Sequence, residues 1–207
     1  MDRCRGLTSR ACRVKSRQQF RGIGGEMVDK LHISAQELLD DSFRLAHRIF
    51  DAGFRPDYIV GVWRGGTPVG IAVQELLKYK GVPTDHIAIR TSSYTGIEEQ
   101  SDEIRVHGLH YIVENVNADD SLLIVDDVFD SGRSVSAVIH TLRSLSRLNT
   151  PKTIRVATVY YKPSKSKVDI APDFYIHETD KWLVFPHEID GLNNAEIAAT
   201  KPLVLGE

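Results

Sequence analysis

The chain has few cysteines, no long apolar run and little net charge. Its only cysteines, Cys4 and Cys12, lack the His or Cys partners of a zinc site and imply no disulfide framework. We therefore expect a reducing, cytoplasmic setting. No apolar run approaches the ~20 residues that span a bilayer, and no secretory segment lies near the start, so an integral membrane protein is not expected. The net charge of −2 gives no indication of nucleic-acid binding.

The remaining composition suits one globular domain. The chain has 207 residues, 42% of them hydrophobic, and no linker or repeat divides it. Residues 1–26 differ, because arginine is frequent there and acids are rare. They suit a basic arm or transit segment, a disordered tail, or sequence upstream of a true start at Met27. The third is favoured, because the codons of residues 24–26 can spell a ribosome-binding site. We expect a disordered basic extension over 1–26 and a single domain over 27–207.

Strands and helices alternate along the rest of the chain. A capping box from Ser34 to Glu37 predicts a helix over 35–52. Apolar runs and helical spacing predict strands at 58–62, 86–89, 121–125 and 153–161 and helices over 69–80 and 134–145. This alternation indicates an α/β fold with a doubly wound, mainly parallel sheet. We further expect a mobile loop with short flanking strands over 91–107, and a small hood of short strands over 174–187, above the sheet's carboxyl edge.

The stretch from Leu122 to Val135 carries the most chemical information. Its apolar start predicts a strand buried on both faces, and Asp126 and Asp127 follow at the carboxyl end, where parallel sheets open into a crevice. The next turn can wrap backbone N–H groups and two hydroxyls around an anion at a helix start; it reads Asp130-Ser131-Gly132-Arg133-Ser134. The pattern predicts a sugar-phosphate site.

A second turn of this kind follows the first predicted strand, at Arg64-Gly65-Gly66. The glycines allow a ligand to approach the backbone closely, and Arg64 offers forked donors that suit a pyrophosphate. Taken alone, this segment would be an ordinary loop between a strand and a helix. Its occurrence together with the acidic stretch favours a phosphate site.

The two turns together resemble those of type I phosphoribosyltransferases, enzymes that use phosphoribosyl pyrophosphate, and the resemblance extends over about residues 30–191. It implies that the ribose hydroxyls are held, directly or through Mg²⁺, by Asp126 and Asp127. It implies that the 5′-phosphate is held by Ser131, Gly132, Arg133 and Ser134. Arg64 and Gly65 would hold the pyrophosphate, with a non-proline cis peptide at Trp63–Arg64. Ser93 and Tyr94 match the family's flexible lid, which keeps water from the reacting sugar.

Two later segments resemble the xanthine–guanine and hypoxanthine branch of the purine enzymes. There a lysine donates to the purine 6-oxo oxygen and an aromatic residue stacks on the ring; the matching base-binding residues are Lys162, Trp182 and Leu183. Taken alone, Lys162 would be a surface charge and Trp182 a core or edge aromatic. Asp130 matches the acid that handles the proton on purine N7, which the adenine and orotate enzymes generally lack. Arg133 and His187 depart from the bacterial pattern, and we expect His187 near the base pocket.

The resemblance therefore implies a glycosyltransferase of purine salvage. A 6-oxopurine attacks C1 of the ribose, pyrophosphate leaves and a nucleoside monophosphate forms. It also implies Mg²⁺ as cofactor, held by Asp126 and Asp127, and a homo-oligomer, either dimer or tetramer. The alternative is a non-catalytic regulator that binds phosphoribosyl pyrophosphate or nucleotides through the same domain. Asp130 and the Ser93-Tyr94 pair favour the enzyme.

Overall fold

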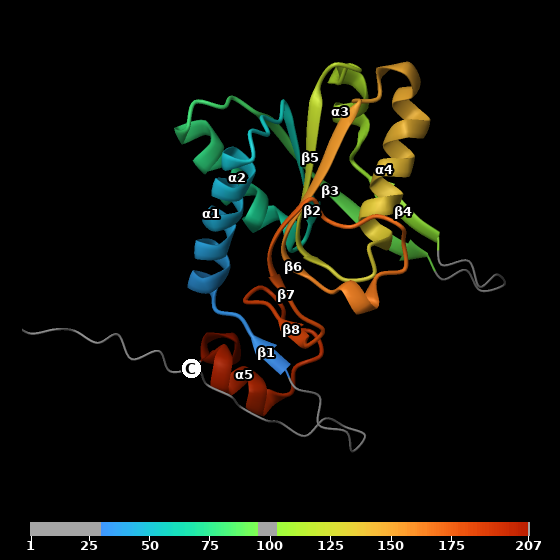
Figure 1. The fold of residues 1–207 in the computed structure, drawn as a ribbon. Helices are drawn as coiled ribbons and strands as arrows, with labels where there is room; N and C mark the ends of the chain where they lie inside the picture. The colour runs from blue at the N-terminus through green and yellow to red at the C-terminus, as the bar shows by residue number, and fades with distance from the viewer. Residues whose placement is uncertain (1–29, 95–102, 207) are drawn as a thin grey trace, which may run out of the picture.

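A twisted six-stranded sheet forms the centre of the protein (Figure 1). The computed structural model describes residues 30–94 and 103–206. The sheet has the strand order β4-β3-β2-β5-β6-β7, and all neighbours are parallel except β3 and β4. Its strands are β2 (Tyr58–Trp63), β3 (Asp85–Tyr94), β4 (Glu103–His107), β5 (Ser121–Phe129), β6 (Thr153–Tyr161) and β7 (Phe174–Glu178).

Helices cover both faces of this sheet (Figure 1). They are α1 (Ala35–Asp51) and α2 (Gly66–Tyr79) on one face, and α3 (His110–Asn115) and α4 (Arg133–Ser146) on the other. Successive residues of β5 alternate between the two cores: Leu123 and Val125 pack beneath α1 and α2, whereas Leu122 and Ile124 pack beneath α3 and α4. This two-sided burial explains the continuous apolar run of β5. The prediction of a doubly wound, mainly parallel sheet is confirmed.

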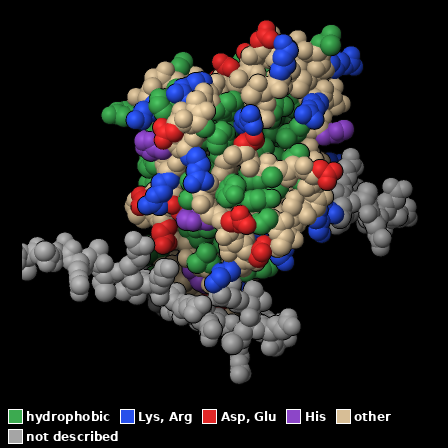
Figure 2. Space-filling view, in the orientation of Figure 1, with side chains coloured by type: hydrophobic (Ala, Val, Ile, Leu, Met, Phe, Trp, Pro, Cys, Tyr) green, Lys and Arg blue, Asp and Glu red, His purple; other side chains and the backbone are tan. Residues whose placement is uncertain are grey.

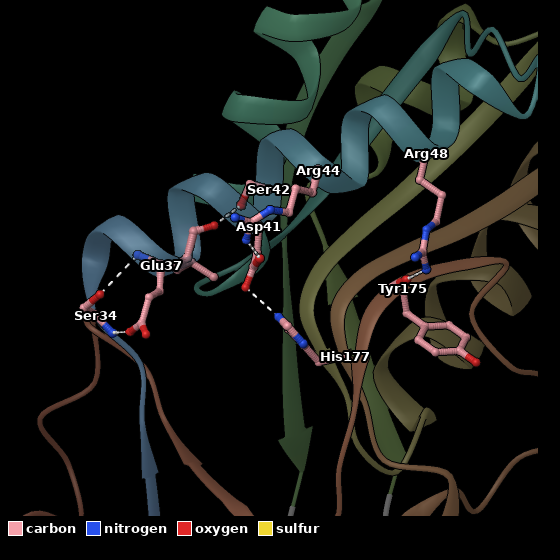
Figure 3. A network of polar contacts seen from close by, with 9 residues as sticks. Ser34, Glu37, Asp41, Ser42, Arg44, Arg48, Tyr175 and His177 are labelled. Atoms are coloured by element: carbon pink, nitrogen blue, oxygen red, sulfur yellow. Dashed lines mark hydrogen bonds and ion pairs between the residues drawn. The ribbon is translucent and has the colours of Figure 1, made fainter. Parts of the chain in front are cut away.

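Helix α1 is capped as predicted and is tied to the edge strand β7 by polar contacts (Figure 3). The Ser34 hydroxyl accepts the Glu37 N–H at 3.1 Å, and the Glu37 carboxylate accepts the Ser34 N–H at 2.9 Å. Further along, the buried Asp41 carboxylate lies 2.6 Å from His177 Nε2 on β7. Burial in this region raises the pKa of Tyr160, which stacks on His177, to about 12.

A separate two-stranded parallel ribbon forms the hood. It pairs β1 (Lys30–His32) with β8 (Trp182–Val184), and α5 (Asn194–Thr200) lies against it (Figure 1). Lys30 Nζ lies 2.5 Å from the carboxylate of the buried Glu196 on α5. Neither β1 nor α5 was predicted. Residues 174–187 were predicted to form the hood, but the first of them form β7, which belongs to the main sheet beside β6. The reason is that Phe174 and Ile176 pack into the core beneath α1 and α2.

The strand predicted at 86–89 is longer in the structure. Strand β3 continues to Tyr94 and pairs antiparallel with β4, so the start of the predicted loop is one arm of a hairpin. The flanking strands of that prediction are present, while residues 95–102 lie outside the described part of the chain. Helix α3 follows the hairpin and was not predicted.

The surface carries charges of both signs. On the face in Figure 2, Lys and Arg side chains alternate with Asp and Glu rather than gathering into a field of one sign. Within residues 30–94 and 103–206, no helix is both long and apolar enough to cross a bilayer.

Candidate active site

The acid pair lies near the carboxyl end of β5, which extends past the predicted boundary to Phe129. Asp126 Oδ1 accepts the Asp127 N–H at 3.0 Å, and Asp127 Oδ1 accepts the Val128 N–H at 2.8 Å. Burial, and then the charge of Asp127, raise the pKa of Asp126 well above its ordinary value, while backbone N–H groups of Asp127 and Gly66 oppose the rise. Two adjacent carboxylates in this setting favour a ligand that brings hydroxyl donors or a cation.

The loop after β2 packs directly on this acid pair. A Cβ atom added to Gly65 would lie 1.9 Å from Asp127 Oδ2, and one added to Gly66 would lie 2.3 Å from the Val125 carbonyl oxygen. Glycine at both positions therefore allows the chain between β2 and α2 to approach β5 closely. The peptide bond between Trp63 and Arg64 is cis, as the resemblance implied.

The turn between β5 and α4 depends on one left-handed residue. Gly132 has a φ of +72°, and an added Cβ would lie 2.4 Å from Val168 and 2.5 Å from the Phe129 ring. The turn leads directly into Arg133, the first residue of α4, whose N–H lies 3.4 Å from the Ser131 hydroxyl. N–H groups at a helix start of this kind can bind an anion.

Thr91, on β3, also reaches this turn, with its hydroxyl 3.5 Å from that of Ser134. Thr91 was not among the predicted site residues, because no local pattern shows that a residue from the hairpin meets the start of α4.

A cavity of about 390 Å³ lies beside the carboxyl end of β5, between the end of β6 and the hood. Its lining includes the predicted catalytic residue Asp130 and the three predicted base-binding residues Lys162, Trp182 and Leu183. Lys162 Nζ lies 2.9 Å from Asp130 Oδ2, and Lys162 is only 8% exposed. A buried ammonium requires such a partner. Lys162 is therefore a buried, paired lysine rather than the surface charge that it would be if taken alone.

The hood supplies the opposite wall of the cavity. Trp182 on β8 is 59% exposed and presents an open aromatic face, whereas its neighbour Leu183 is buried. Asp190 also lines the cavity and lies 4.0 Å from Arg64 Nη1, which connects the cavity with the loop after β2. The two parts of the predicted site are therefore neighbours.

The other three predicted residues lie at the end of β3 and in the turn after β8. Ser93 and Tyr94 end β3, where their backbones pair with Ile104 and Glu103. His187 was expected near the base pocket. Its chain neighbour Glu188 lines the cavity, whereas His187 Nε2 lies 3.4 Å from Asp127 Oδ2. The hood therefore brings His187 to the acid pair, a contact that sequence reasoning missed.

A family model described as the phosphoribosyl transferase domain matches residues 31–190. The chain belongs to this family. It is a phosphoribosyltransferase, a glycosyltransferase-type enzyme, as the sequence motifs predicted. The match begins in β1 and ends just after β8, so it includes both the sheet and the hood.

Individual relatives agree with this assignment. The chain is 23% identical over 168 residues to the hypoxanthine-guanine phosphoribosyltransferase of Streptococcus pyogenes serotype M3, covering 81% of this chain and 88% of that protein. It is 28% identical over 131 residues to the protein of the same name from Bacillus subtilis, covering 63% and 67%. The crystal structure of a purine phosphoribosyltransferase from Pyrococcus horikoshii Ot3 superposes with a TM-score of 0.64 at 26% identity, covering 80% of this chain and 98% of that one.

Proposed function

We propose that this protein transfers the phosphoribosyl group from phosphoribosyl pyrophosphate to a 6-oxopurine, as part of purine salvage. The observation that carries the proposal is the buried Lys162 paired with Asp130 in a cavity walled by Trp182. A cationic donor beside a carboxylate matches the 6-oxo and N7 positions of such a base, and the exposed indole offers a stacking surface. The hypoxanthine-guanine relatives support the same class of substrate.

In this proposal the base site works through two side chains. Lys162 donates a hydrogen bond to the 6-oxo oxygen. Asp130 takes the proton from N7 as N9 of the same ring attacks C1 of the ribose and pyrophosphate leaves. General acid–base assistance of this kind typically contributes about 10²–10⁴-fold in rate. Trp182 and Leu183 hold the ring in the plane that attack requires.

The sugar-phosphate site works through backbone and carboxylate groups. Asp126 and Asp127 accept hydrogen bonds from the ribose hydroxyls. The 5′-phosphate lies at the start of α4, held by Ser131, Gly132, Arg133 and Ser134. Arg64 and the N–H of Gly65 face the pyrophosphate, and Ser93 and Tyr94 belong to the lid that excludes water during transfer.

The donor set fits a magnesium ion that arrives with its substrate. Across residues 30–94 and 103–206, no three His, Cys, Asp or Glu side chains are grouped as an all-protein metal site. Mg²⁺ prefers one or two carboxylates together with substrate phosphates, and Asp126 and Asp127 supply the carboxylates. When bound, the ion would offset the charge that develops on the leaving pyrophosphate. We also propose a dimer or tetramer in the cytoplasm, as the resemblance implies.

The decisive experiment is turnover of guanine, xanthine, hypoxanthine and adenine with phosphoribosyl pyrophosphate. We expect product from one or more 6-oxopurines and none from adenine. Lys162→Gln should lose 6-oxopurine turnover through kcat/KM while phosphoribosyl pyrophosphate binds as before. Comparable activity on adenine and guanine would contradict the role of Lys162. Binding of phosphoribosyl pyrophosphate without turnover of any base would favour the non-catalytic regulator.

A further inference from the structure

His187 joins the hood to the acid pair and has no role in the function proposed above. It lies in the turn after β8, with its side chain 26% exposed. Its ring stacks on Phe185, with 5.5 Å between centroids and 12° between planes. Nε2 lies 3.4 Å from Asp127 Oδ2, whereas the buried Nδ1 has no hydrogen-bond partner among the described residues.

Packing alone does not account for a histidine at this position, because one of its nitrogens is buried without a partner in the described part of the chain. A buried polar atom without a partner destabilises a fold, so packing on Phe185 alone would favour a phenylalanine or leucine. Among the described residues, the approach of Nε2 to Asp127 Oδ2 is the polar contact that this ring makes. Because an ionised carboxylate can only accept, the contact is attractive when the ring carries a hydrogen on Nε2.

The Asp127 carboxylate is contacted on several sides. Oδ1 accepts the Val128 N–H at 2.8 Å, Oδ2 faces His187, and the backbone of Gly65 packs against the whole group. Val128 belongs to β5 and Gly65 to the turn between β2 and α2, whereas His187 comes from the hood. Removing it would leave Oδ2 without that donor and release the rotation of the carboxylate.

We propose that His187 is a positioning residue, which donates from Nε2 to Asp127 and holds its carboxylate in the orientation that binds the ribose. The inference rests on the proposed function, because it assigns Asp127 to the sugar. His187 does not line the base cavity, so its effect should fall on phosphoribosyl pyrophosphate and leave recognition of the base unchanged.

Two variants separate this role from packing. His187→Phe keeps a ring against Phe185 but removes the donor, whereas His187→Gln keeps an amide donor near the place of Nε2. Affinity for phosphoribosyl pyrophosphate with Mg²⁺ is measured by calorimetry without any base, together with the KM values of both substrates. H187F should weaken phosphoribosyl pyrophosphate about tenfold and leave the KM of the base within about twofold. H187Q should restore most of the affinity.

The outcomes distinguish this inference from the proposed function. If the wild type binds phosphoribosyl pyrophosphate and H187F binds it equally well, or if H187Q is as weak as H187F, the positioning role is overturned while the proposed function stands. H187F would also overturn the positioning role if it weakened the affinity for phosphoribosyl pyrophosphate and raised the KM of the base by equal factors. If the wild type neither binds phosphoribosyl pyrophosphate nor turns over a base, both fail. Should H187F not fold, His187→Asn, whose amide is too short to reach Asp127, takes its place.

Discussion

Gly65 and Gly66 are adjacent in the chain, yet they face different kinds of atom. A Cβ at Gly65 would meet the Asp127 carboxylate, which is the end of a side chain. A Cβ at Gly66 would meet the Val125 carbonyl at 2.3 Å and the Asp126 Cα at 2.9 Å, both of them backbone atoms of the central strand. A side chain can rotate away from an intruding methyl group, but a strand in the middle of a sheet cannot.

Gly66→Ala should therefore destabilise the protein by about 1–3 kcal/mol, because overpacking forces backbone to move, and it should also reduce activity by displacing the acid pair. Gly70→Ala on the same helix is the matched control. The nearest atom to its added methyl group is 3.8 Å away, so it should stabilise α2 by about 0.5–1 kcal/mol. Denaturant unfolding of both variants measures the difference. A G66A protein as stable as the wild type would contradict the close approach.

Lys162 and Asp130 differ in burial, and this decides which of the pair is harder to replace. The lysine side chain is 10% exposed and the aspartate side chain 51%. Loss of the carboxylate leaves a buried ammonium with only a neutral partner, whereas loss of the lysine leaves a carboxylate that water can reach.

Asp130→Asn should reduce kcat about 10²–10⁴-fold, because the amide cannot take a proton from N7. The Asn side-chain oxygen still accepts from Lys162, so phosphoribosyl pyrophosphate should bind nearly as in the wild type. Steady-state kinetics and calorimetry measure the two quantities separately. An unchanged kcat would remove Asp130 from the mechanism. Ser136→Ala on α4, the helix that follows Asp130, controls for general effects of substitution near the site.

At the scale of elements, the hood contains an unusual histidine. Both ring nitrogens of His32 on β1 are buried without a partner in the described part of the chain. Burial, followed by the charge of Lys201, lowers the pKa of His32, and Glu196 only partly opposes this. A lowered pKa means that the folded state resists protonation. The hood should therefore keep its full stability above the ordinary value of about 6.5 and lose it as the pH falls towards the lowered pKa.

His32→Leu should raise the melting temperature, and the gain should be larger at pH 5.5 than at pH 7.5. At the higher pH the variant removes two unsatisfied nitrogens, about 1 kcal/mol or roughly 2–4 °C. At the lower pH it also removes the cost of protonating a buried ring. Thermal unfolding of wild type and variant at both values tests this. A gain of the same size at both would contradict the pH-dependent part.

At the scale of the whole molecule, most of the sheet could be predicted because its strands are apolar runs covered on both faces. β1 could not, since three residues have no measurable period and the partner strand lies near the other end of the chain. The polar end of β3 was assigned to a loop for a related reason: its strand partner is the hairpin arm β4, outside the apolar core.

In the candidate site, too, some residues could be predicted from the sequence and others could not. Asp130 and Lys162 could be selected from motifs at strand ends, because parallel strands bring their carboxyl ends to one edge. The contact of His187 with Asp127 could not, because it depends on how the hood folds back over the sheet. Thr91 beside Ser134 depends in the same way on the hairpin.

Removal of residues 1–26 should leave both activity and melting temperature unchanged. The family match begins at residue 31, and no motif of the site lies in that segment. The truncated chain starting at Met27 is compared with the full chain in turnover and thermal unfolding. A large loss of either would show that the basic segment takes part in folding or catalysis.

Lys30 pairs with Trp182, which is synthesised about 150 residues later, so the hood can form only after most of the chain has been made. Synthesis begins at the N-terminus, and a domain generally folds as a unit. A nascent chain that has emerged as far as Tyr161 carries β2, β5 and β6, and with them the acid pair and the phosphate turn. At that moment β1 has no partner and the base has no stacking wall. Recognition of the base is therefore the last property that the growing chain acquires.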